Sequence, residues 1–147
     1  MRKEWMALKQ LDQQLGDLQG FSMPKQGWIR TLRKALGMTI KQLAKHLAVD
    51  PSRVVKLETS EMDGGVTLKS LRKVADALDC HVVYAFVPRQ SLQTTITQRA
   101  QQLAKQQVTT VSHSMTLEQQ GVSTHWQHEQ IETLQHELLN KPWKHLW

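Results

Sequence analysis

The feature that most constrains the fold is a pair of short amphipathic segments separated by only three residues. In residues 39–47, the side chain of Thr39 can cap a helix, and the apolar residues that follow it fall on one helical face. They are Ile40, Leu43, Ala44 and Leu47. Residues 48–50 leave room for nothing more than a tight connection, so a second element must begin almost at once.

That second element is a helix that begins at Asp50-Pro51. Asp is a favoured N-cap residue, and Pro fits the first helical position that follows it. Residues 52–59 continue the helix, with Val54 and Leu57 on its inner side. Two short helices joined by so tight a turn predict a helix-turn-helix, with the small Ala44 where the two helices cross.

The outer face of the second helix carries the side chains that a DNA reader needs. Arg53 can bond guanine through two hydrogen bonds, worth about 1–3 kcal/mol of discrimination, and Ser52 and Lys56 can bond bases or phosphates. The start of the first helix suits a phosphate oxygen. The predicted DNA-binding residues are Thr39, Ile40, Lys41, Lys45, Pro51, Ser52, Arg53, Val55 and Lys56, and Arg30, Arg33 and Lys34 are expected to add backbone contacts. The alternative is a helical bundle with a solvated basic face.

The charge distribution favours DNA over that alternative. The formal net charge is +6. Residues 24–89 hold twelve Lys or Arg against six Asp or Glu, so the whole surplus lies in this segment and the rest of the chain has no net charge. Such a surplus suits nucleic acid first and an acidic membrane surface second. We expect a cytoplasmic protein without a membrane segment or bound metal, because the chain has one cysteine, no apolar leader and no long apolar run. Motifs for catalysis or cofactor binding are missing, so an enzyme is not expected.

The rest of the chain divides around this segment. We expect an N-terminal helical arm at residues 1–23, the helix-turn-helix domain at 24–80 and a helical C-terminal region at 89–147. Residues 81–88 between them hold a β-branched and aromatic run that ends at Pro88 and predicts one short strand. A lone strand needs a partner, so two copies are expected to pair across a dimer axis; the alternative is a strand covered within its own chain.

In the C-terminal region, apolar spacing predicts helices at residues 91–107 and 127–139, separated by a loop or short elements. The final seven residues hold two of the five tryptophans, which are expected to dock on this chain or on a partner. The predicted fold class is therefore mainly α: a helix-turn-helix bundle with one short strand and a helical C-terminal extension.

Residues 36–58, LGMTIKQLAKHLAVDPSRVVKLE, resemble the Cro/C1-type helix-turn-helix of phage-repressor (lambda repressor-like) and XRE-like regulators. The resemblance implies a transcriptional regulator that binds double-stranded operator DNA. If two copies form a two-fold homodimer, the operator is expected to hold an inverted repeat. Ala48 departs from that pattern, which often has Gly in the turn, and it fits only if φ is not strongly positive or if some strain is accepted. Pro51 removes one amide from the start of the reader helix.

A wider resemblance reaches most of the chain. PKQGWIRTLRKALGMTIKQLAKHL, VVKLETSE, TLKSLRKVADALDCHVVYAFVPRQSL and SHSMTLEQQ are similar to the family called mobile mystery protein A. In that family the gene lies beside one for a Fic-domain protein. The resemblance therefore implies an autorepressing antitoxin of a Fic-domain toxin. A plain dimeric XRE-like repressor, or a Fic inhibitor with weak DNA binding, stays open.

Direct inhibition of a Fic enzyme would use a Ser/Thr-x-x-x-Glu motif followed by Gly or Asn. Ser114 and Glu118 have this spacing, but Gln119 follows them, and Thr133 and Glu137 have it as well. With this composition about one such match is expected by chance. Ser114 and Glu118 are the favoured inhibitory pair, and the alternative is that Ser114 is an ordinary N-cap.

Overall fold

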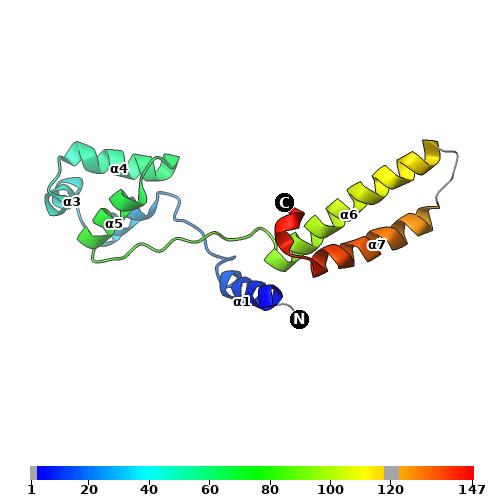
Figure 1. The fold of residues 1–147 in the computed structure, drawn as a ribbon. Coiled ribbons are helices and arrows are strands. Elements are labelled where there is room, and N and C mark those ends of the chain that lie inside the picture. The colour runs from blue at the N-terminus through cyan, green and yellow to red at the C-terminus, as the bar shows by residue number, and fades with distance from the viewer. Residues whose placement is uncertain (1–2, 118–122) are drawn as a thin grey trace. The chain divides into compact units, whose positions relative to one another are not determined.

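The computed structural model describes residues 3–117 and 123–147, and within those ranges the chain forms helices and connecting segments but no β-strand (Figure 1). The chain divides into two compact units. Residues 20–85 make the helix-turn-helix unit, and residues 1–19 and 86–147 make the other, the C-terminal unit. The helix at the N-terminus therefore clusters with the C-terminal region, although the sequence suggested an arm of its own.

Four helices build the helix-turn-helix unit: α2 (Trp28–Ala35), α3 (Ile40–Leu47), α4 (Pro51–Asp63) and α5 (Leu68–Ala77). One apolar core joins them, made by Ile29, Leu43, Ala44, Val54, Leu57, Val74 and Leu78. The predicted inner faces of α3 and α4 are thus confirmed, since Leu43 and Val54 are fully buried.

Side chains cap the starts of α3, α4 and α5, and the caps at Thr39 and Asp50 are those that the sequence predicts. Thr39 Oγ1 accepts from Gln42 N at 3.1 Å, and Gln42 Oε1 accepts from Thr39 N at 2.8 Å, which completes a capping box. Asp50 Oδ1 accepts from Ser52 N at 2.9 Å, and Thr67 Oγ1 accepts from Ser70 N at 3.0 Å. Each bond satisfies one backbone donor that a helix start leaves open.

Two carboxylates of α4 fasten α2 to the rest of the unit. Glu61 accepts from the backbone of Trp28 at 2.6 Å and of Ile29 at 3.0 Å, which caps α2 from a distant part of the chain. Glu58 pairs with Arg33, whose Nε lies 2.6 Å from Glu58 Oε1, and Arg33 also donates to Met38 O at 3.0 Å. Arg33 is buried, so the expectation that it contacts the DNA backbone is wrong.

The turn between α3 and α4 is strained at Ala48. Its φ of 53° and ψ of 43° lie in the left-handed region, where the turn closes with a hydrogen bond from Val49 N to Ala44 O at 3.0 Å. A Cβ in this conformation costs about 1–2 kcal/mol. The sequence allowed Ala48 either a φ that is not strongly positive or a positive φ with some strain, and the structure has the second.

Residues 81–87 do not form the predicted strand. No β-bridge is present in the described residues, and Val83, Tyr84 and Phe86 are exposed. The physical reason is that a strand needs a neighbour for its backbone groups, and residues 3–117 and 123–147 offer no second strand. The residue pattern alone does not make a strand.

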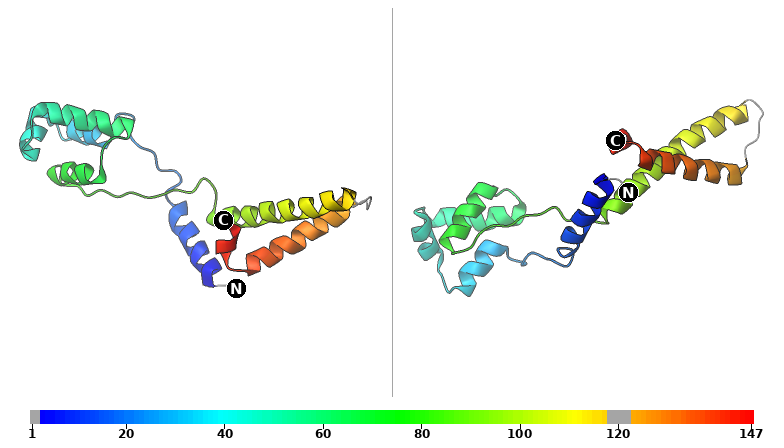
Figure 2. Two further views of the ribbon diagram at one scale, coloured as in Figure 1. Left: turned by 45° about the horizontal axis from the view of Figure 1, so that its top comes forward. Right: turned by 60° about the horizontal axis from the view of Figure 1, so that its bottom comes forward.

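The C-terminal unit consists of α1 (Lys3–Gly16), α6 (Leu92–Leu117), α7 (Thr124–Asn140) and the 3-10 helix η1 (Trp143–Leu146). Figures 1 and 2 show α6 and α7 as a long hairpin, with η1 beside its open end. The core of this unit contains Ile96, Ala100, Ala104, Leu138 and Leu146. The observed α6 continues to Leu117, ten residues beyond the predicted end at residue 107. Val108 and Ser112, in this additional part of the helix, are buried.

The first helix, α1, packs Trp5 and Leu8 against the core of this unit and adds polar contacts. Asp12 accepts from Leu92 N at 2.6 Å and from Gln93 N at 3.0 Å, which caps α6. Trp5 meets Trp143 edge-on, with ring centroids 5.6 Å apart. Trp143 and Leu146 thus dock on this chain, as expected for the tryptophan-rich end, whereas Trp147 is exposed.

Across the two described ranges, no helix combines the length and the apolar character that a membrane crossing requires.

Candidate nucleic-acid interface

The outer face of α4 is exposed along its length. Ser52, Lys56 and Thr59 are all exposed and recur at the spacing of one helical face, opposite the buried Val54 and Leu57. The buried side chains hold α4 against the core while the outer ones face solvent. Ser52 and Lys56 are among the predicted DNA-binding residues, whereas Thr59, at the end of the predicted helix, is not.

A hydrogen-bond cluster organises the N-terminal end of this face. Asp50 Oδ1 accepts from both the backbone N of Ser52, at 2.9 Å, and its Oγ, at 2.7 Å. Both bonds lower the pKa of Asp50 below its ordinary value of 3.8, and the bond from the Ser52 side chain has the larger effect. Asp50 is therefore ionised at neutral pH, and Ser52 is held in a fixed conformation beside it.

Arg53 lies on the flank of α4 rather than at the centre of its outer face. It is exposed and lines a groove of about 480 Å³ whose other walls come from α3 and α5. Ser70 and Lys73 of α5 line the same groove. Val55 occupies the opposite flank and is also exposed. Pro51 is exposed at the start of the helix.

The start of α3 supplies a second group of predicted contacts. Lys41 and Lys45 are exposed, with Lys45 one turn after Lys41 on the same helix. The Thr39 hydroxyl oxygen is already engaged as the cap, yet the residue itself is exposed. Ile40 packs against the core cluster with its side chain, so only its backbone N–H remains suited to a phosphate.

Ser114 and Glu118, the pair expected to inhibit a Fic enzyme, are not part of the helix-turn-helix unit. Ser114 is exposed on α6 of the C-terminal unit, and Glu118 lies outside the described residues. Thr133 and Glu137, which share the same spacing, both line a groove between α6 and α7.

A comparison with protein families agrees with this geometry. The family model described as "Helix-turn-helix" matches residues 29–84, which include nearly all of α2 and the whole of α3, α4 and α5. No curated protein matches the chain, and no solved structure does. Residues 29–84 therefore form a helix-turn-helix domain, and such domains are the DNA-binding modules of XRE-like transcription regulators.

Proposed function

We propose that this protein is a sequence-specific repressor that lays the outer face of α4 in the major groove of its operator. The observation that carries the proposal is the division of α4 into a buried side, Val54 and Leu57, and an exposed side, Ser52, Lys56 and Thr59. A reader helix needs such a division, because its underside must fix it rigidly while its outer side reaches base edges.

Phosphate contacts would come from α3. Lys41 and Lys45 are exposed cations on this short helix, and the amides at its start carry the positive end of the helix dipole. Contacts of this kind position a protein on DNA without reading the sequence. The exposed Arg30 and Lys34 of α2 would add to them, whereas the buried Arg33 would not.

A homodimer is the second part of the proposal. Residues 81–87 belong to no helix, and Val83, Tyr84 and Phe86 expose apolar surface. Pairing with the same segment of a second copy would cover these side chains and satisfy the backbone groups at once. A two-fold dimer would recognise an inverted repeat, with half-sites near one helical turn apart.

The test of this proposal is binding of the purified full chain to the DNA upstream of its own gene, in the presence of excess random duplex. We expect a discrete complex that a mutated inverted repeat abolishes, with affinity at least about a thousandfold above that for random DNA. Equal affinity for both duplexes would overturn sequence-specific repression.

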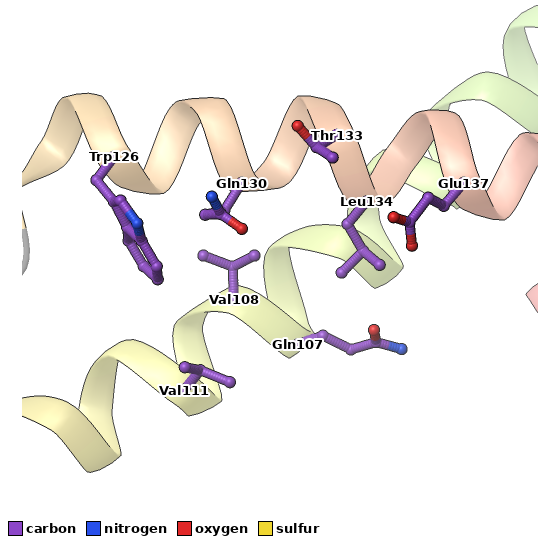
Figure 3. Close-up of a pocket in the computed structure, with 8 residues that line it drawn as sticks. All are labelled: Gln107, Val108, Val111, Trp126, Gln130, Thr133, Leu134 and Glu137. Atoms are coloured by element: carbon purple, nitrogen blue, oxygen red, sulfur yellow. The ribbon is translucent and has the colours of Figure 1, made fainter.

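The second candidate function, neutralisation of a Fic-domain toxin, rests on the resemblance to the mobile mystery protein A family together with one feature of the C-terminal unit. Between α6 and α7 lies a groove of about 310 Å³, in which Val111 and Trp126 offer apolar surface and Glu137 and Gln130 offer polar groups (Figure 3). Val111 is half exposed and lines this groove, so its side chain is accessible to a partner.

Substitutions in that groove test this second function. Val111→Asp would place a charge among apolar side chains, and we expect it to weaken binding of a purified Fic-domain protein, of the kind encoded beside members of that family, at least about tenfold. Gln106→Asp adds the same charge at an exposed position of α6 that does not line the groove, and it should leave binding unchanged. Full affinity of the Val111→Asp variant would remove the groove from toxin binding, and no binding by the wild type would leave a plain repressor.

A further inference from the structure

The hydroxyl of Ser52 has its only hydrogen committed. Ser52 Oγ lies 2.7 Å from Asp50 Oδ1, and because the ionised Asp50 can only accept, the serine is the donor. The same carboxylate oxygen accepts from Ser52 N, so the residue is tied at two points. What Ser52 offers to an incoming base is therefore a pair of oxygen lone pairs and no donor.

Thr59 repeats this arrangement two turns further along the same face. Its Oγ1 donates to Val55 O at 3.0 Å, which again uses the only hydroxyl hydrogen. Lys56 lies between the two residues in sequence and has the opposite polarity, since an ammonium group can only donate. The exposed face of α4 thus has two acceptors and one cation.

Base pairs differ in the major groove by the same property. Adenine N6 and cytosine N4 are donors, whereas guanine N7 and O6 and thymine O4 are acceptors. On the basis of the proposed function, we infer that Ser52 and Thr59 select bases with an exocyclic amine, adenine or cytosine, and that Lys56 favours guanine, which presents two acceptors. In this inference Asp50 is a positioning residue: it contacts no base and sets the polarity of Ser52.

The first experiment removes the Ser52 hydroxyl from the protein and the exocyclic amine from the DNA base, each in turn. The full chain is used to select its preferred duplex from a random pool, and Ser52→Ala identifies the base pair whose preference depends on Ser52. We expect adenine or cytosine there. Where the base is adenine, replacing it with purine, which lacks the N6 amine, should weaken wild-type binding about tenfold. The same replacement should have no effect on Ser52→Ala.

The second experiment changes Asp50 and leaves Ser52 in place. Asp50→Gly frees the Ser52 hydroxyl to donate, while a Gly N-cap costs the helix only a few tenths of a kcal/mol, so the domain stays folded. We expect this variant to accept guanine or thymine at the Ser52 position about as well as adenine or cytosine. Asp50→Asn is the matched control, because its amide oxygen still accepts from Ser52 and should keep the wild-type preference.

Three results would overturn the inference. Guanine or thymine at the Ser52 position of the wild-type site would do so, as would a Ser52→Ala variant with every base preference intact. An Asp50→Gly variant with the wild-type preference would show that Asp50 is only a helix cap. A wild-type chain that selects no sequence at all would overturn the proposed function itself and this inference with it, so the two failures are distinguishable.

Discussion

At the residue scale, the ion pair between Arg33 and Glu58 decides how the reader helix is held. Both side chains are largely buried, and the distance of 2.6 Å between Arg33 Nε and Glu58 Oε1 makes this a charge-assisted hydrogen bond. The sequence showed Arg33 only as one more cation on a basic segment. Its burial could not be predicted from charge, because it depends on Glu58 of α4 lying opposite α2.

Arg33→Ala should therefore destabilise the domain strongly. Removal of the guanidinium leaves Glu58 buried without its partner, and we expect the free energy of unfolding to fall by about 3–5 kcal/mol. Urea unfolding followed by circular dichroism measures it. Arg30→Ala, an exposed arginine three residues earlier, should change stability by less than about 0.5 kcal/mol. Equal effects of the two substitutions would contradict a structural role for Arg33.

Ala48→Gly should stabilise the domain, in contrast to Arg33→Ala. The left-handed φ of 53° at Ala48 strains an L-residue and suits glycine. Relief of this strain outweighs the greater freedom of glycine in the unfolded chain, so we expect the unfolding free energy to rise by about 0.5–1 kcal/mol. A lower midpoint for Ala48→Gly in the same urea titration would show that this turn is not strained in solution.

Lys45 and Lys56 should differ in what they contribute to DNA binding. Lys45→Ala is expected to weaken operator and random DNA alike and to reduce the slope of log affinity against log salt by about one unit. Lys56→Ala should weaken the operator complex more than the random one, because Lys56 lies on the outer face of α4. Fluorescence anisotropy at several salt concentrations measures both. An unchanged slope for Lys45→Ala would remove Lys45 from phosphate contact.

At the element scale, the structure shows which helices are specified by local sequence. The starts of α3, α4 and α5 follow from Thr39, Asp50 and Thr67, since each cap is a bond between near neighbours in the chain. Residues 81–87 and the end of α6 could not be predicted in the same way. The first needs a partner strand, and the second depends on burial of Val108, for which no local signal exists.

The N-cap of α4 should make part of the domain's stability depend on acid. The pKa of Asp50 is lowered in the folded protein, so its contribution is complete above the ordinary value of 3.8 and is lost as the pH falls through the lower folded value. Asp50→Asn removes this titration. We expect the difference in unfolding free energy between wild type and Asp50→Asn to be constant near neutral pH and to shift against the wild type below about pH 4. A difference that is independent of pH down to pH 2 would show that the carboxylate gains nothing from its bonds to Ser52.

At the scale of the whole molecule, the chain leaves the C-terminal unit after α1, builds the helix-turn-helix unit and then returns. The sequence identifies the amphipathic helices of both units, but it does not say that α1 packs with α6. That packing depends on Asp12, which caps a helix eighty residues away, and on Trp5 beside Trp143. Pairings over such distances are not encoded in local spacing.

Asp12→Ala should loosen α1 without disturbing the reader helix. The substitution removes both backbone bonds to the start of α6, and α1 has no fully buried residue to hold it otherwise. We expect faster amide hydrogen exchange in α1 and in the first turn of α6, with unchanged protection in α3 and α4. Asp12→Asn, whose amide oxygen can still accept, should show a smaller effect. Faster exchange in α3 and α4 as well would contradict two separate units.

The central expectation for this protein is that the outer face of α4 is the surface that meets DNA. Amide chemical-shift mapping of the ¹⁵N-labelled full chain, titrated with the selected duplex, tests this most directly. The largest shifts should fall on residues 39–41 and 52–59, with α6 and α7 little changed. Shifts concentrated in the C-terminal unit, or none in α4 when the duplex is bound, would contradict it.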